Sequence, residues 1–283
     1  MVGVPLTTNG FGEGAVRQRI FSGEVVWRPA SLESGAVVAC AWQALVDGLG
    51  TDAPRDAFGE ADNDAFFERF TAVRRAFPQA AGARAAVARW LVAGGWSPAT
   101  TFVDGPRLRA LTPWGHRIPA AAAAYAPHRD TWFANPAAQV NVWLAVHDTA
   151  ASEVVAWYPH HFACPVPNTS SGFDLDAWSA SGGFQAESGA PQHHPAPQPG
   201  VKLGVPVQRA MAAGESLIFS AAQLHGTLPS RDAQIRYSVE VRVVDRSDVA
   251  RGLGAILVDS AARGDTSAAM WALDEAQATA VRP

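Results

Sequence analysis

Cysteine is scarce in this chain: its 283 residues include only Cys40 and Cys164. Two thiols cannot build the disulfide framework of a small secreted protein, so we expect both to be reduced. No apolar run approaches the roughly 20 residues that cross a bilayer. The N-terminus also lacks a basic region followed by an apolar stretch, which a secretion signal requires. These absences predict a cytoplasmic protein with no membrane span.

An excess of positive charge is missing too. The 22 Lys and Arg residues are outnumbered by 26 Asp and Glu residues, which gives a formal net charge of -4. Nothing in the chain resembles a basic stripe, so nucleic acid is not expected as a partner. The length suits one large domain or two small ones, and we expect a single domain, 1–283, with a sizeable core. The sequence leaves the oligomeric state unknown.

The first hundred residues carry helical patterns. Apolar residues recur at helical spacing in 31–50, 63–78 and 83–95, and each stretch ends at Gly or Pro. Residues 101–245 instead contain short alternating or β-branched runs separated by turn residues. Together these patterns predict an α+β fold. We expect a double-stranded β-helix, a jelly-roll or cupin-like barrel, flanked by helices mainly from the N-terminal third.

Two further segments complete the expected layout. Residues 162–200 are rich in Pro, Gly and Ser and form a lid-like insertion in the barrel. Its aromatic residues Phe173, Trp178 and Phe184 are candidate contacts with substrate or with the barrel rim. A passive insertion remains the alternative. The C-terminal part, 246–283, is predicted to be a helical tail with a closing helix at 267–280.

A candidate metal site begins in the segment "PHRDTW", residues 127–132. In a strand, residues i and i+2 point to one face, so His128 and Asp130 would project together. Alone, the pair is also compatible with an ordinary surface contact. His225 follows an apolar strand and offers a third ligand, although it is also compatible with a core histidine. Two histidines and one carboxylate are typical of non-haem Fe(II) oxygenases, where they leave metal positions free.

An anion anchor follows on the next expected strand. Arg236 and Ser238, in "RYS", again lie at i and i+2, and an Arg fork binds a carboxylate bidentately. A 2-oxo acid that chelates the metal needs such an anchor for its far carboxylate. An ordinary exposed Arg is the alternative. Gln139 and Asn141 form another i, i+2 pair, whose amides suit either binding of 2-oxoglutarate or substrate, or plain polar positions in a sheet.

The ordered set H-x-D, distal His and R-x-S resembles the Fe(II)/2-oxoglutarate-dependent dioxygenases. The phytanoyl-CoA dioxygenase-like branch is the most similar in the framing segments "VNVWLAVHDTAASEVVAWYPHH" and "VPVQRAMAAGESLIFSAAQLHGTLPSRDAQIRYSVEVRVVD". The resemblance covers roughly residues 105–245. It implies that His128, Asp130 and His225 hold Fe(II), and that 2-oxoglutarate chelates the iron and meets Arg236 and Ser238.

The resemblance also implies a reaction. A small molecule or natural-product intermediate would be hydroxylated by dioxygen, with release of succinate and CO2, and desaturation or cyclisation would be variants. Asp130 disfavours halogenation, because related halogenases replace this carboxylate with a small residue. Two other classes stay open: a cupin-like metalloenzyme that does not use 2-oxoglutarate, and a non-catalytic small-molecule-binding barrel.

Several other polar residues near the motifs have no assigned role. The doublets His160–His161 and His193–His194 are interpreted as loop residues, although His160 or His161 could line the pocket. Arg107, Arg109 and Arg117 precede the motif. They suit either a substrate acid or ordinary solvated positions.

Overall fold

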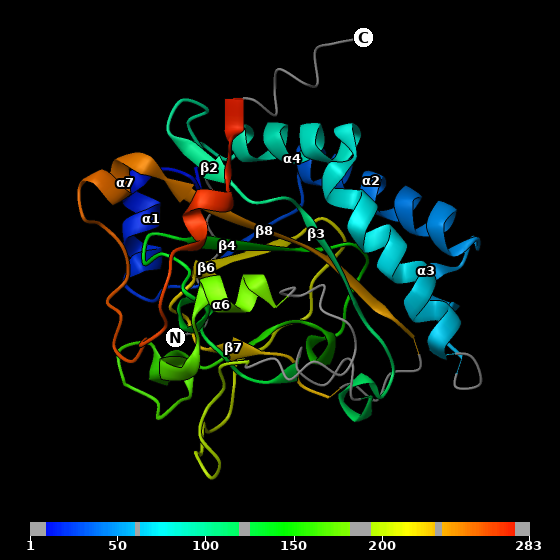
Figure 1. The fold of residues 1–283 in the computed structure, drawn as a ribbon. Coiled ribbons are helices and arrows are strands. Elements are labelled where there is room, and N and C mark those ends of the chain that lie inside the picture. The colour runs from blue at the N-terminus through cyan, green and yellow to red at the C-terminus, as the bar shows by residue number, and fades with distance from the viewer. Residues whose placement is uncertain (1–9, 60–62, 119–124, 182–193, 230–233, 275–283) are drawn as a thin grey trace.

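The computed structural model describes residues 10–59, 63–118, 125–181, 194–229 and 234–274. It combines helices with antiparallel sheet (Figure 1). The large sheet has seven strands in the order β1-β6-β4-β8-β2-β9, with β3 also paired to β8. Its strands are β1 (Val26–Arg28), β2 (Thr101–Val103), β3 (Arg107–Leu111), β4 (Val140–Ala145), β6 (Ser216–Ser220), β8 (Arg236–Asp245) and β9 (Trp271–Ala272). A smaller sheet pairs β5 (Ala156–Trp157) with β7 (His225–Gly226).

The α-helices in the first hundred described residues lie where the sequence predicts helices, with one addition at the start. Across all described residues, the structure gives α1 (Gly14–Phe21), α2 (Leu32–Leu49), α3 (Asn63–Ala76), α4 (Ala81–Ala93), α6 (Leu175–Ala180) and α7 (Arg246–Ala250). The clearest boundary is that of α2. The Ser31 hydroxyl accepts a hydrogen bond from the Ser34 amide in a capping box, and Gly50 ends the helix in the left-handed conformation.

Short 3-10 turns connect many of these elements. They span Pro54–Asp56, Phe77–Gln79, Gly115–Arg117, Asp130–Phe133, Ala151–Glu153, Pro159–His161, Ser170–Gly172 and Thr266–Ala269. None of the helices in the described segments has the length and hydropathy of a membrane span.

The two faces of the large sheet differ in chemistry. On β8, alternate residues Tyr237, Val239, Val241 and Val243 are buried in the main hydrophobic core together with residues of α2, α3 and α4. We call the opposite face the site face. It carries Asn141 and Trp143 of β4 and Arg236, Ser238, Glu240 and Arg242 of β8, because side chains alternate along a strand. Helices α2, α3 and α4 therefore pack against one face, and the polar face is left for the site.

The C-terminal tail departs from the expected helix. Thr266–Ala269 forms a 3-10 turn, and β9 follows and pairs with the edge strand β2. Leu273 is fully buried, and the Arg84 guanidinium lies 4.5 Å from the centre of the Trp271 ring. The helix prediction is therefore wrong for 267–272, because pairing with a sheet edge outweighs the helix propensity of the alanines. Residues 275–280 of the predicted helix lie outside the described residues.

The described parts of 162–200 are structured rather than loose. Asn168 forms an isolated bridge with Pro197, which ties the two ends of the segment together. Phe173 is buried, and its backbone pairs with Arg263 of the tail. The lid prediction rests in part on Phe184, which lies outside the described residues. The described ends of the segment are anchored to the body of the protein.

Candidate metal centre

The structure brings together all three residues that the sequence predicts as metal ligands. The backbones of His128 and His225 pair directly, with N–O distances of 2.7 and 2.9 Å in the two directions. Asp130 is not in a strand, as the i, i+2 argument assumed, but begins the 3-10 turn Asp130–Phe133. That turn, rather than strand alternation, directs the carboxylate toward the two imidazoles.

The three side chains form a compact cluster. The Asp130 Oδ1 atom lies 3.4 Å from His128 Nε2 and 3.9 Å from His225 Nε2. The two imidazole ring centres are 4.5 Å apart. Each residue offers one ligand atom, and these atoms all lie within 4.8 Å of one another. Two nitrogens and one carboxylate oxygen on one side of a cation can hold a transition metal and leave its other positions open.

Hydrogen bonds to the backbone fix the tautomer of both histidines. His128 Nδ1 lies 2.9 Å from the Ala126 carbonyl oxygen, and His225 Nδ1 lies 2.8 Å from that of Gln223. A carbonyl oxygen can only accept, so each Nδ1 carries a proton, and in the neutral form of each ring Nε2 presents its lone pair to the cluster. Burial, with a smaller contribution from His128, lowers the pKa of His225 to about 4. His225 is therefore neutral and able to bind a metal at neutral pH.

The second oxygen of Asp130 is held by three donors. Asp130 Oδ2 accepts hydrogen bonds from Asn141 Nδ2 at 2.8 Å and from Gln139 Nε2 at 3.2 Å. Arg242 Nε lies 3.3 Å from the same oxygen. Burial by itself would raise the pKa of Asp130, but Arg242 and the two histidines outweigh it, so its pKa lies well below the usual range. The carboxylate is ionised, and Oδ1 is left for a metal.

These contacts change the interpretation of the amide pair. The sequence suggested that Gln139 and Asn141 could bind 2-oxoglutarate or substrate, whereas their amide nitrogens are directed at Asp130. Sequence reasoning missed Arg242, which lies directly opposite Asn141 in the β4–β8 register. Continuing the i, i+2 pattern from Arg236 and Ser238 along the same strand would have reached it.

The predicted anion anchor is a buried cation. The side chain of Arg236 is 4% exposed, and its Nη1 donates to Ser238 Oγ at 2.6 Å. Its guanidinium carbon lies 5.3 Å from the centre of the Trp143 ring, and Nε has no hydrogen-bond partner among the described residues. Burial lowers the pKa of Arg236 to about 10, with Glu240 acting in the opposite direction. A buried guanidinium with an unmet donor suits an anionic ligand.

Arg129 lies between His128 and Asp130 in the sequence, and its side chain anchors this segment to other parts of the protein. Its guanidinium pairs with Asp259 at 3.0 Å and donates to the backbone carbonyls of Ala222, His161 and Cys164. Trp132 Nε1 donates to the same Asp259 carboxylate at 2.8 Å. One buried ion pair thus joins the ligand segment to the C-terminal tail. The sequence offered no signal for it.

Aromatic side chains enclose the cluster. Phe133 and Phe219 pack edge-on against His128 and His225, at centroid distances of 5.4 and 5.0 Å. Phe173 contacts Phe133 at 5.4 Å. Of the three aromatic contacts expected from 162–200, Phe173 therefore lies one ring away from a ligand. These rings limit the access of water to the cluster.

His160 and His161 are not part of the cluster. His160 is exposed, and His161 Nε2 lies 3.1 Å from the Leu203 carbonyl oxygen. His193 lies outside the described residues. We assign neither His160 nor His161 a role in metal binding.

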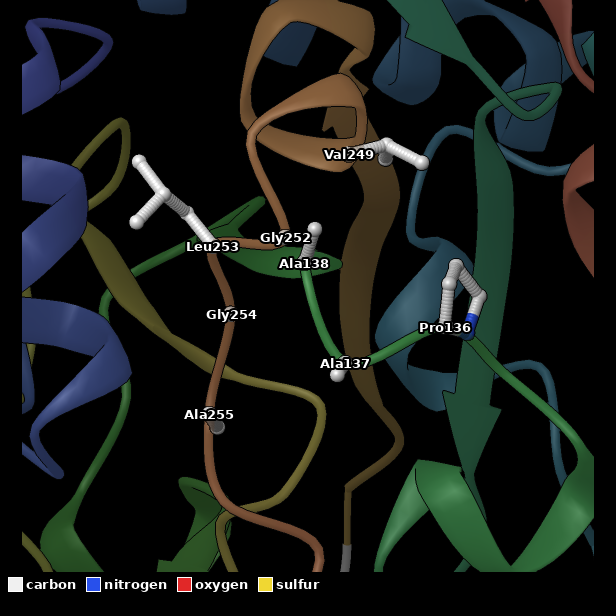
Figure 2. A pocket seen from close by; sticks show the side chains of 8 residues that line it. All are labelled: Pro136, Ala137, Ala138, Val249, Gly252, Leu253, Gly254 and Ala255. Carbon is white, nitrogen blue, oxygen red and sulfur yellow. The ribbon is translucent and has the colours of Figure 1, made fainter.

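The structure also has a surface cavity of about 250 Å³ (Figure 2). It is formed by the segment before β4, residues 136–138, and by Val249 with residues 252–255. Its lining is apolar side chains and backbone, and it contains none of the candidate ligands. We assign it no part in the chemistry.

Comparison with known proteins yields structural similarities only. No family model and no curated protein matches the sequence. Three solved structures illustrate the similarity, each with a TM-score of 0.42. The non-haem monooxygenase ThoJ is 14% identical, and the match covers 77% of this chain and 71% of that chain. The epimerase SnoN with Fe3+, alpha ketoglutarate and nogalamycin RO is 15% identical (82% of this chain, 85% of that chain), and EvdO2 from Micromonospora carbonacea var. aurantiaca with 2-oxoglutarate is 14% identical (86% of this chain, 94% of that chain). Such low identities and TM-scores establish neither family nor function, which must come from this chain's own residues.

Replacing Arg242 by Met should weaken metal binding about 10- to 100-fold, because Asp130 loses the charge that keeps it ionised and oriented. Anaerobic titration with Co(II), followed by its visible absorption, measures the dissociation constant. Arg251→Met is the control. Arg251 is an exposed residue directly after α7, so this variant should bind Co(II) normally. Equal Co(II) affinities in the two variants would show that Arg242 does not support the ligand.

Proposed function

We propose that this protein is a non-haem Fe(II)- and 2-oxoglutarate-dependent oxygenase that acts on a small molecule or natural-product intermediate. Hydroxylation is the proposed outcome, with release of succinate and CO2. One observation supports the proposal above all. The site combines two imidazole nitrogens and one ionised carboxylate with a buried, incompletely paired guanidinium on the neighbouring sheet face.

The residues divide the work of binding. His128 Nε2, His225 Nε2 and Asp130 Oδ1 would hold the iron, and three protein ligands leave positions free for a cosubstrate and dioxygen. Arg236 and Ser238 would bind the far carboxylate of 2-oxoglutarate through charge-assisted hydrogen bonds. Iron with a bound 2-oxo acid supplies the oxidation of substrate by dioxygen, coupled to decarboxylation of the 2-oxo acid. The rings of Phe133 and Phe219 cover part of the two imidazoles.

The finer fold assignment belongs to the same proposal. We propose that the two antiparallel sheets are the two layers of a double-stranded β-helix, with residues 1–283 in a single domain. The placement of His225 on β7 of the small sheet, beside the site face of the large sheet, supports this arrangement. The phytanoyl-CoA dioxygenase-like branch rests on the sequence resemblance alone.

One experiment separates this function from its two alternatives. The protein is titrated anaerobically with Fe(II) and then with 2-oxoglutarate, and the weak visible metal-to-ligand charge-transfer band is recorded. A band indicates a chelated cosubstrate and supports the oxygenase. Iron binding without a band favours a cupin-like metalloenzyme that does not use 2-oxoglutarate. Absence of iron binding favours a small-molecule-binding barrel without catalysis.

Replacing His128, Asp130 or His225 by Ala should abolish the charge-transfer band and succinate formation, because two remaining ligands hold Fe(II) poorly. Circular dichroism should show that the fold persists. His160→Ala removes an exposed histidine outside the cluster and should retain both signals. Full succinate formation in any one of the three ligand variants would remove that residue from the site.

Replacing Arg236 by Ala or Lys should mainly weaken 2-oxoglutarate binding. A charge-assisted bidentate contact contributes about 2 kcal/mol or more, which corresponds to a rise of tens of fold in the KM for 2-oxoglutarate. Titration of the charge-transfer band gives the same affinity without a substrate. Fe(II) affinity should change little. An unchanged 2-oxoglutarate affinity would mean that the anchor lies elsewhere.

A further inference from the structure

We propose that Arg107 and Arg109 bind an anionic oxygen group of the substrate, a carboxylate or a phosphate. This inference rests on the proposed function, because the substrate is that of the proposed oxygenase. The anion site itself is defined by the geometry of β3 and β8.

Strand pairing places both arginines on the site face. Arg107 lies opposite Glu240 and Arg109 lies opposite Ser238 in the antiparallel β3–β8 register. Residues that face each other across antiparallel strands project to the same side of the sheet. Leu108 between them is fully buried in the core on the helix side. The two guanidinium groups therefore share a face with the 2-oxoglutarate anchor and with the donors to Asp130.

Exposure shows where this face is open. Strand β8 has β3 on one side and β4 on the other, yet the side chain of Glu240 is 34% exposed, whereas Ser238 is completely buried. Arg107 and Arg109, beside it on β3, are 32% and 34% exposed. Exposure of this degree in the middle of a sheet means that the face above it is incompletely covered. Arg242, two residues further along β8, connects the opening to Asp130 of the metal centre.

Both guanidinium groups have donors to spare. Arg107 pairs through Nη2 with Asp104 Oδ2 at 2.7 Å, and Arg109 donates through Nε to Glu240 Oε2 at 3.0 Å. Those are their side-chain partners within the described segments. Each guanidinium carries five N–H donors, so most of them remain for a ligand. Two such forks two residues apart on one strand match the several acceptor oxygens of a carboxylate or phosphate.

The charge balance of the site face also favours an anion. Four arginines meet three carboxylates there: Arg107, Arg109, Arg236 and Arg242 against Asp104, Asp130 and Glu240. A divalent metal and doubly charged 2-oxoglutarate cancel, so the surplus of one positive charge persists in the loaded site. Burial, followed by the nearby Arg242, lowers the pKa of Arg107 to about 10. A bound anion would offset the repulsion between Arg107 and Arg242, whereas a cationic substrate would be repelled by both.

The competing interpretation is that both ion pairs merely fasten β3 to β8. The two interpretations differ in what they expect of Glu240. If Arg109 serves a substrate anion, Glu240 competes with that anion and holds the guanidinium in place until it arrives. Removing the charge of Glu240 should then strengthen anion binding. A purely structural pair gains nothing from the same change.

The test is calorimetric titration with inorganic phosphate and with acetate, without iron or 2-oxoglutarate. It is performed in an Arg236→Gln background so that the buried guanidinium cannot contribute. Adding Arg107→Gln or Arg109→Gln should weaken binding of the preferred anion at least about tenfold. Glu240→Gln should strengthen it several-fold. Arg89→Gln, which removes one exposed charge from α4, is the matched control and should leave binding unchanged.

The outcomes are separable. Preference for phosphate or for acetate identifies the class of substrate anion. Absence of millimolar binding to either, equal losses in Arg89→Gln and Arg109→Gln, or no gain in Glu240→Gln would overturn the proposal. Thermal unfolding of each variant excludes loss of fold as the cause. The charge-transfer experiment tests the oxygenase proposal separately, because the anion titration involves neither iron nor 2-oxoglutarate.

Discussion

The buried carboxylate of Asp130 is the constraint on which the rest of the site depends. Removing an ionised carboxylate from water costs several kcal/mol unless charges and hydrogen bonds replace the lost hydration. Here Asn141 and Arg242, directly opposite each other on β4 and β8, converge with Gln139 on a single oxygen. The register of the two central strands thus determines which oxygen is held and which faces the histidines. A shift of one residue between these strands would place the two donors on opposite faces of the sheet.

The histidines depend on backbone geometry in a similar way. The main chains of His128 and His225 are hydrogen-bonded to each other, which fixes the positions of the two Cα atoms relative to each other. The carbonyls of Ala126 and Gln223, each two residues before its histidine, orient the rings from behind. Ligand geometry is therefore set by main-chain hydrogen bonds, which depend little on the identity of neighbouring side chains.

This division explains how much of the site could be predicted from the sequence. The predicted site residues are chemically distinctive, and their order in the sequence is recognisable. That order is enough to predict that they form one site: His128, Asp130, His225, Arg236 and Ser238. The supporting contacts could not be predicted, because they join distant positions with no local signature. Arg129 and Asp259 are separated by 130 residues, and nothing near either one indicates the other.

The same reasoning applies to the fold. Helices with clear caps, such as α2 with Ser31 and Gly50, follow from local chemistry, and the structure agrees. The conformation of the tail does not follow from local chemistry, because Trp271 and Ala272 form a strand only where β2 offers a free edge. Asp130 is a similar case, since it begins a turn in place of the expected strand, and within that turn Trp132 donates a hydrogen bond to the distant Asp259. Local propensity fails where a distant partner decides the conformation.

The charge of Arg242 acts on both the metal centre and the proposed anion site. Without metal, its guanidinium stabilises Asp130; beside a bound divalent cation, the same charge would be repulsive. Two further carboxylates lie near it: Asp104, whose Oδ1 accepts from the Arg242 amide at 2.8 Å, and Glu240. Burial by itself would lower the pKa of Arg242, but Asp130, Asp104 and Glu240 outweigh burial and raise it. Those two carboxylates offset the repulsion, so the guanidinium can support the ligand in both states. The charged residues around the proposed anion site therefore also set the electrostatics of the metal centre.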